Sequence, residues 1–322
     1  MIRKFRDDFQ TVETLAALLR YLPKGHEKIP KVEADYNKYN SGLRGEQNVD
    51  YYLSGLPKQD YHIYRSLRIR YEKYAFQIDT LLITDRYIMP IETKNHTGII
   101  EIDEQNQFYQ IAYDSKAKIS SPLHQVNRHV YELQRWLTRR HLPQLPFKWL
   151  VCFSNPTTTI RNLSSDSTIQ ERVVNIENLI DYVKKLTETM TLKASKNLNK
   201  NDIEKINFHL LSDHSTLTSS VLENYGIKLR ELETGVQCPS CKKLAMVYKS
   251  KKWHCPHCGE TSTDAHIQAI KDYLLIFKPS ITIKEGCDFL HIQSSNIVRR
   301  LFSSMNLVGT GNTNARSYKL PK

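Results

Sequence analysis

Apolar and polar residues in the first 95 positions follow the helical period at first and the strand period later. Residues 9–22 place apolar side chains at helical spacing, and a second helix is predicted at about 42–55, in GLRGEQNVDYYL. The stretches YHIYRSLRI, FQIDTLLIT and YIMPIETK are rich in β-branched and aromatic residues, which predicts three strands. Helices and strands mixed in this way indicate a sheet covered by helices.

The pattern continues with a strongly amphipathic helix at 123–140, in which Val126, Val130 and Leu133 share one face. The continuous apolar run FKWLVCFS predicts a central strand, and RVVNIENLIDYVKKL predicts a strand that runs into a helix. We therefore predict that the main domain has the α/β fold class with a mixed sheet.

The remainder of the chain divides into shorter parts. A polar stretch with helical spacing in places is predicted to be a helical connector, and a compact cysteine module follows it. The last residues predict three helices and a short hairpin, an arrangement that resembles a winged helix-turn-helix. The predicted parts are an N-terminal helical extension at 1–37, the main domain at 38–185, the connector at 186–235, the cysteine module at 236–262 and the C-terminal domain at 263–322.

The third predicted strand ends in the charged residues Glu92 and Lys94, whose side chains share one face because strand residues alternate. If the second and third strands pair antiparallel, Asp79 becomes a neighbour of Glu92. A divalent cation would relieve the repulsion between the two carboxylates, and oxygen ligands such as these and the backbone carbonyl of Thr93 suit Mg²⁺ or Mn²⁺. Lys94 would then help an attacking water to lose its proton and would contact a phosphate. An exposed salt bridge between Glu92 and Lys94 is the alternative.

Four stretches in sequence order carry a resemblance to a known family: SGLRGEQNVDYYLSGLP, FQIDTLLIT, PIETKNHTGII and SPLHQVNRHVYELQRWL. Together they resemble the NERD (nuclease-related) domain of the PD-(D/E)xK nuclease superfamily, over about residues 38–155. The resemblance implies a restriction-endonuclease-like core with two metal-binding acids, a catalytic lysine, a further acid that binds metal or positions water, and a glutamine that faces the site. The matching residues are, in that order, Asp79 and Glu92, Lys94, Glu46 and Gln125.

Two of these matches also have simpler interpretations. Glu46 could be an acid favoured near the N-terminus of a helix. Gln125 could be an ordinary amide on a helix surface.

The cysteine module contains CPSC and CPHC separated by thirteen residues. Two such turns complete a tetrahedral thiolate site, so a structural Zn²⁺ bound by Cys238, Cys241, Cys255 and Cys258 is predicted, with a β-hairpin between the turns. A redox pair or an iron–sulfur cluster is the alternative. Lys251 and Lys252, next to an aromatic residue on the hairpin, suit contact with nucleic acid.

The net charge of +12 is concentrated towards the end of the chain, because residues 228–322 contain 15 Lys and Arg against 7 Asp and Glu. An uneven basic charge favours a nucleic-acid partner, although a solvated basic surface would look the same. In the C-terminal domain, Asn296, Arg299 and Arg300 of the third helix and Arg316 of the hairpin are candidates for binding DNA. Contact with another protein is the alternative for this domain.

Neither a transmembrane run nor a signal peptide is recognisable, so we expect a cytoplasmic protein without a membrane partner. The combined prediction is a Mg²⁺-dependent nuclease that acts on nucleic acid, with DNA favoured over RNA, and whose zinc-binding cysteine module (a zinc ribbon) and C-terminal domain bind the nucleic acid. Two alternatives stay open: a non-catalytic or regulatory nucleic-acid-binding protein on a nuclease scaffold, and a component of a larger DNA-processing or defence complex. A homodimer is also open, because paired cuts in duplex DNA would favour one.

Overall fold

The computed structural model describes residues 1–7, 9–71, 74–113, 115–193, 197–216, 220–311 and 316–321. The chain folds into two compact units. The first contains Met1–Phe9 and Tyr39–Leu217, and the second contains Gln10–Lys38 and Thr218–Lys322. The five-part division predicted from the sequence stays a prediction.

A six-stranded mixed sheet forms the centre of the first unit, as the sequence predicted. Its order is β1-β2-β3-β4-β8-β10. Strands β2, β3 and β4 form an antiparallel meander, whereas β1 is parallel to β2, and β8 is parallel to both β4 and β10. The strands are β1 (Ile2–Lys4), β2 (His62–Tyr71), β3 (Tyr74–Ile83), β4 (Ile88–Lys94), β8 (Leu150–Phe153) and β10 (Val173–Asn175).

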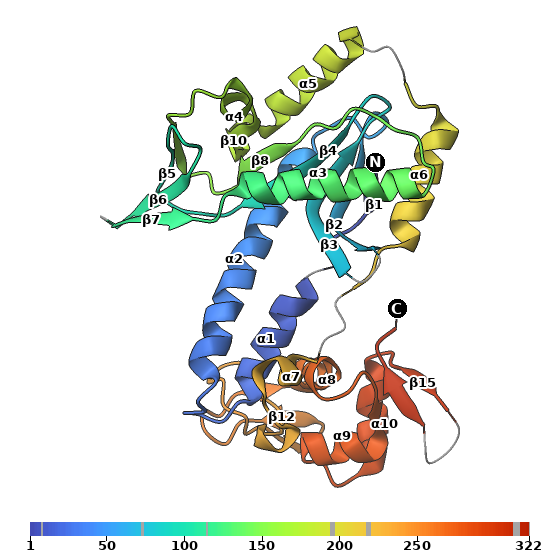
Figure 1. Cartoon of the computed structure of the whole chain (residues 1–322). Coiled ribbons are helices and arrows are strands. Elements are labelled where there is room, and N and C mark those ends of the chain that lie inside the picture. The colour runs from blue at the N-terminus through green and yellow to red at the C-terminus, as the bar shows by residue number, and fades with distance from the viewer. Residues whose placement is uncertain are drawn as a thin grey trace. The chain divides into compact units, whose positions relative to one another are not determined.

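Helices cover both faces of this sheet. On one face, α3 (Pro122–Arg139) and α6 (Lys200–Ser212) contribute Leu133, Trp136 and Leu210 to a core with β2 and β3. Figure 1 shows α3 lying across these strands. On the other face, α2 (Ile29–Leu53) and α5 (Leu179–Lys193) pack through residues such as Val49 and Val183. Burial of these apolar faces is the main stabilisation of the unit.

The second helix begins earlier than predicted, at Ile29 instead of residue 42. The added stretch, IPKVEADYNKYNS, is mostly polar, and most of its side chains from residue 33 onward are exposed or half-buried. Because it carries no wide apolar stripe, the hydrophobic period could not reveal it.

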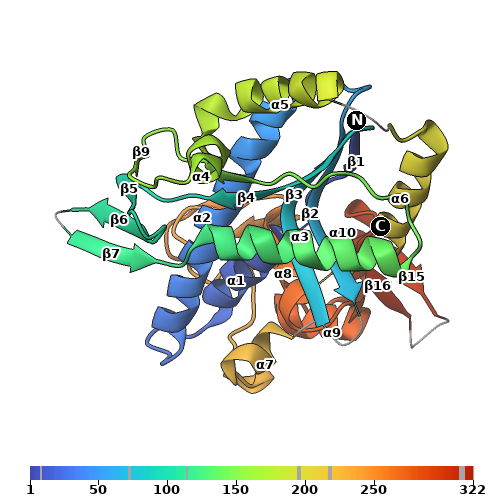
Figure 2. The ribbon, with the colours of Figure 1, turned by 45° about the horizontal axis from the view of Figure 1, so that its top comes forward.

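A second, smaller sheet in the first unit was not predicted. It consists of β5 (Ile99–Ile102), β6 (Phe108–Ala112), β7 (Ser115–Ile119) and β9 (Thr159–Asn162), in the order β7-β6-β5-β9. Both views show it extending outward beside β4 and the short α4 (Ser167–Arg172) (Figures 1 and 2). Its strands have four or five residues, and Ile100, Ile102 and Phe108 pack with Val126 in a small apolar core. Strands this short give a weak periodic signal.

In the second unit, residues from Gln10–Lys38 share one hydrophobic core with residues from the C-terminal third of the chain. Helix α1 (Phe9–Tyr21) confirms the predicted first helix, and Tyr21 packs against Phe277 and Phe289 in an aromatic cluster. Arg20 forms a bidentate ion pair with Asp272, whose side chain is buried. The other helical elements of this unit are α7 (Val221–Tyr225), η2 (Leu229–Glu231), α8 (Ala265–Ile276), α9 (Ile283–Leu290) and α10 (Ser295–Ser304).

Two small sheets complete the second unit. The cysteine module contains β11 (Val247–Lys249), β12 (Lys252–His254) and β13 (Thr261–Ser262), and its predicted hairpin is confirmed as β11–β12. The C-terminal sheet contains β14 (Ile281–Thr282), β15 (Val308–Thr310) and β16 (Ser317–Lys319) in the order β14-β16-β15. In the described parts of both units, every helix is too short or too polar to cross a membrane.

Candidate active site and zinc centre

The candidate site lies where β3 and β4 separate. Their antiparallel ladder ends at the pair Thr80 and Ile91; beyond it, β3 stays paired with β2, and β4 with β8. Asp79 and Glu92 are the next residues in register, so the predicted neighbours do lie opposite each other. We call the place where the two strands separate the fork. The Asp79 carboxylate bridges it, because its Oδ2 accepts a hydrogen bond from the backbone N–H of Thr93 at 2.9 Å.

Glu92 and Lys94 form an ion pair on the β4 face that α3 covers. The Lys94 Nζ lies 2.7 Å from Oε1 of Glu92. The Glu92 side chain is 3% exposed and that of Lys94 is 21% exposed. An exposed salt bridge is therefore the wrong description of this pair, because its anion is removed from water and only the lysine side chain is partly exposed.

The electrostatics of the fork make Asp79 hard to ionise. Burial, and then the nearby charge of Glu92, raise the pKa of Asp79 to about 7, although the Thr93 N–H, Lys94 and His129 oppose the shift. Two carboxylates thus share a site with too little compensating charge. A bound cation would remove this penalty.

His129 belongs to the same cluster and was missed by the sequence analysis. Its Nδ1 lies 3.5 Å from Oε2 of Glu92, and both atoms are buried without a hydrogen-bond partner among the described residues. Burial lowers the pKa of His129, which favours the neutral ring. A signal did exist, because His129 follows Gln125 by four residues on α3 and so shares its side of the helix. Gln125 itself is half-buried.

Helix α2 approaches the ends of β4 and β8 very closely at Gly45. A side chain there would place its Cβ 2.5 Å from the Oγ of Ser154 and 2.6 Å from the Cβ of Asn95, so glycine is required. Asn48 donates to the Ser154 carbonyl at 3.2 Å, which fastens the helix to the strand. This packing explains the glycine in RGEQN and sets the position of the neighbouring Glu46.

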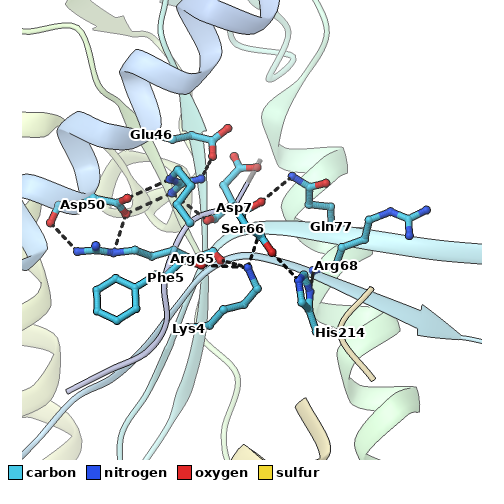
Figure 3. A network of polar contacts seen from close by, with 12 residues as sticks. Lys4, Phe5, Asp7, Glu46, Asp50, Arg65, Ser66, Arg68, Gln77 and His214 are labelled. Atoms are coloured by element: carbon cyan, nitrogen blue, oxygen red, sulfur yellow. Dashed lines mark hydrogen bonds and ion pairs between the residues drawn. The ribbon is translucent and has the colours of Figure 1, made fainter. Parts of the chain in front are cut away.

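Glu46 is the partner of an arginine from the start of the chain. Arg6 forms an ion pair with Glu46, and its Nε lies 2.9 Å from Oδ2 of Asp50. Its Nη2 also donates to the backbone carbonyl of Asp79 at 3.4 Å. Figure 3 shows this network, in which Glu46 and Asp50 point from α2 towards the segment after β1. The proposed role of Glu46 as a metal ligand stays a prediction.

The same network ties the N-terminal segment to β2. The Nζ of Lys4 donates to the carbonyl of Arg65 at 3.0 Å and to Asp7 at 2.7 Å, and Asp7 contacts His214 at 2.9 Å (Figure 3). Arg65 contacts Asp50 at 3.1 Å. The segment that carries Arg6 is therefore attached both to α2, through Arg6, and to β2, through Lys4.

The donor atoms at the fork suit a hard cation. The Asp79 and Glu92 carboxylates and the Thr93 carbonyl all offer oxygen atoms, and the buried Oε2 of Glu92 still has an unused lone pair. Mg²⁺ typically binds one or two protein carboxylates and keeps several waters. The residues therefore fit such an ion.

Comparison with known families agrees with this geometry. Residues 41–154 match the family model of the nuclease-related domain, NERD. The chain carries a NERD domain. The matched segment contains Glu46, the fork and all of α3, but not Arg6. No curated protein and no solved structure matches the chain.

Outside the NERD domain, the second unit holds a metal-binding cluster. The four Sγ atoms of Cys238, Cys241, Cys255 and Cys258 lie within 4.8 Å of one another, and among the described residues they are the only group of three or more Cys, His, Asp or Glu arranged so closely. The pairs Cys238–Cys258 and Cys241–Cys255 are each 3.6 Å apart. Four convergent thiols without a fifth donor indicate a closed structural zinc site.

The two turns of this centre have the same backbone geometry. Lys242 and Gly259, which follow the second cysteine of each turn, have φ angles of 61° and 75°. Their N–H groups donate to the carbonyls of Cys238 and Cys255 at 3.1 and 3.0 Å. Two equivalent knuckles are typical of a zinc ribbon.

The candidate nucleic-acid residues of the second unit lie at two exposed places. Lys251 and Lys252 occupy the turn and first strand residue of the ribbon hairpin. On α10, Asn296, Arg299 and Arg300 are exposed, opposite the buried face of that helix.

Arg316 directly precedes β16, and its guanidinium lies 5.5 Å from the ring centre of Tyr318. A Cβ at Gly309 would come within 2.4 Å of its Nε, so that glycine makes room for the arginine. Residues 312–315 of the predicted hairpin lie outside the described residues.

Proposed function

We propose that this protein is a Mg²⁺-dependent nuclease that hydrolyses phosphodiester bonds, in DNA rather than RNA. The observation that carries the proposal is the gathering of Asp79, Glu92 and Lys94 at the fork between β3 and β4, inside a NERD domain. A protein that only binds nucleic acid has no need for two carboxylates that repel each other beside a lysine.

Each side chain has a defined task in this proposal. Asp79, Glu92 and the carbonyl of Thr93 would hold the ion. When bound, Mg²⁺ would supply positive charge to the phosphate and make water easier to ionise. Lys94 would direct its Nζ to a phosphate oxygen and favour loss of a proton from the attacking water. Gln125 would face the site from α3, and Glu46 would complete its acidic side.

The second unit would supply affinity for DNA. Three helices followed by a hairpin, with Arg299 and Arg300 exposed on the third helix, support a winged-helix mode of binding. Lys251 and Lys252 on the ribbon would contact the phosphate backbone. The ribbon's zinc would stabilise the module, because so few residues cannot form a sufficient core alone. Reduced thiols at this centre suit the cytoplasm, where we place the activity.

A non-catalytic nucleic-acid-binding protein is the second candidate. One observation favours it: the Glu46 carboxylate is paired with Arg6 instead of standing open to a cation.

Cleavage assays with a charge-matched control separate the two candidates. Wild type, Lys94→Ala and Lys118→Ala would be compared on single- and double-stranded DNA and RNA, with Mg²⁺ or with chelator. Lys118 is an exposed lysine of β7 and serves as the control. We expect Mg²⁺-dependent cleavage that falls by at least about 100-fold in Lys94→Ala only. A Lys94→Ala protein that cuts like wild type would refute the site, and binding without cleavage in all three would establish the non-catalytic candidate.

A further inference from the structure

Helix α3 carries a basic and aromatic stripe on its solvent face. Four residues of α3 lie three, four and four positions apart, which places them along one side of the helix: Arg128, Tyr131, Arg135 and Arg139. We call this group the arginine stripe. All four are exposed, and Tyr131 is 57% exposed. At a rise of 1.5 Å per residue the arginine stripe is about 16 Å long. That length corresponds to about five nucleotides at the spacing of one strand in a duplex.

Aromatic rings organise the guanidinium groups of the arginine stripe. Arg135 lies 5.4 Å from the ring centre of Tyr71 and 5.5 Å from that of Tyr131, and Arg139 lies 5.6 Å from Tyr71. Tyr71 is buried beneath them on β2. Stacked guanidiniums lose little freedom when they bind, so they present a prepared surface for phosphate oxygens. The flanking acid, Glu132, accepts a hydrogen bond from Tyr74 at 2.6 Å.

The arginine stripe begins at the candidate active site. Arg128 directly precedes His129, whose ring lies 3.5 Å from Glu92. Gln125, the predicted site glutamine, lies one turn earlier on the same helix. A polyanion lying along α3 would therefore reach the fork between β3 and β4 at its end.

We propose that the arginine stripe binds single-stranded DNA and leads it to the candidate active site. The inference rests on the proposed function for its direction, but not for the binding itself. The three guanidiniums suit phosphate groups along one strand, in charge and in their planar donor geometry. The exposed ring of Tyr131 can stack on an unpaired base, and the bases of a duplex are already stacked on each other. We therefore expect this surface to bind single-stranded DNA in preference to duplex DNA.

Binding is measured with the full chain in a Lys94→Ala background and with chelator, so that cleavage does not interfere. The probe is a fluorescein-labelled 20-nucleotide single-stranded DNA of mixed sequence, with the corresponding duplex as a second arm. The test variant combines Arg128→Gln, Arg135→Gln and Arg139→Gln. The matched control combines Lys184→Gln, Lys185→Gln and Lys205→Gln, which removes the same charge from exposed positions of α5 and α6.

We expect the test variant to bind the single strand about 100-fold more weakly at 0.1 M salt and to reduce the salt slope by about 2, since each phosphate contact contributes about 0.7. The control variant should stay within about threefold of its parent. Tyr131→Ala should weaken single-strand binding more than duplex binding. If Gln at 135 and 139 lowers the melting temperature, the single charge reversal Arg128→Glu repeats the test, because Arg128 is not stacked on Tyr71.

Equal losses in the test and control variants would overturn the inference, as would a loss confined to the duplex. The enzymatic proposal is tested separately. If the wild-type protein does not cut DNA but the arginine stripe variant loses single-strand binding, the binding surface stands and the nuclease assignment falls. If wild type cuts and the variant binds normally, the nuclease assignment stands and the arginine stripe does not.

Discussion

Asp79→Asn should stabilise the metal-free protein while weakening its response to Mg²⁺. The substitution removes the charge that Glu92 repels, and the amide oxygen can still accept the hydrogen bond from the Thr93 N–H. Substitution of a residue that stabilises the fold would instead lower the stability of the metal-free protein. Higher stability without metal together with a weaker response to Mg²⁺ would indicate a functional residue that destabilises the metal-free fold.

The magnitude follows from the pKa of Asp79, which burial and Glu92 raise from an ordinary 3.8 to about 7. At about 1.4 kcal/mol per pKa unit, full ionisation costs the folded state about 4 kcal/mol. Asp79 is only half-buried, so solvent screens its charge, and its neighbours can reorient. We therefore expect Asp79→Asn to gain about half of this cost, roughly 2 kcal/mol. For a unit of this size that gain corresponds to an increase of about 6 °C in melting temperature.

The effect has a defined pH dependence. A carboxyl whose pKa is raised on folding binds its proton more tightly in the folded state, so wild-type stability falls as pH rises from about 4 to about 7. The penalty is fully present at pH 8 and absent below pH 4. The advantage of Asp79→Asn should therefore be largest at pH 8 and should disappear towards pH 4.

Thermal melts at pH 5, 6, 7 and 8 would be recorded with chelator and with 10 mM Mg²⁺, with Asp60→Asn as an exposed control for the same chemical change. If the ion binds with a Kd of about 1 mM, it adds about 1.4 kcal/mol to the wild type at this concentration. The variant should gain less than half as much, because it has lost a charged ligand. Since the two units can melt separately, hydrogen exchange at β3 and β4 assigns the transition.

An Asp79→Asn protein that is equally or less stable than wild type at pH 8 without metal would refute this prediction. In that case the two carboxylates do not oppose each other in the folded protein. An unchanged response to Mg²⁺ would remove Asp79 from the ligand set.

Three further predictions concern the surroundings of the site and the zinc centre. Arg6→Ala removes a buried partner of Glu46 and Asp50 and should lower the free energy of unfolding in urea by about 3 kcal/mol. A loss below about 0.5 kcal/mol would show that these ion pairs are not structural. His129→Ala should weaken Mg²⁺ binding in calorimetry about tenfold, whereas His129→Asn, which keeps a donor near the Nδ1 position, should stay within about threefold. Equal losses would show that the polar contact with Glu92 is unimportant. Cys238→Ser should lose its zinc in metal analysis and expose β11 and β12 to hydrogen exchange; one retained zinc per chain would contradict the ligand set.

The sequence by itself determined the features that depend on residues close together in the chain. Helical period predicted α1 and α3, and β-rich runs predicted β2, β3 and β4. Two CxxC turns predicted the four-cysteine cluster, because each turn brings its own sulfurs together and thirteen residues suffice to close the pair. The neighbours Asp79 and Glu92 were predictable for a similar reason, since a tight turn between two strands sets their register.

Only the tertiary structure decided which distant side chains meet these residues. Arg6 reaches Glu46 and the Asp79 carbonyl because β1 joins the edge of the sheet in parallel with β2, a pairing that no local pattern encodes. His129 approaches Glu92 because α3 crosses the face of β4, although its place on α3 was readable. Helix α1 shares a core with residues near 277 and 289 because burial of apolar surface has no direction along the chain. Local periodicity specifies which face of an element is buried, but not the partner that buries it.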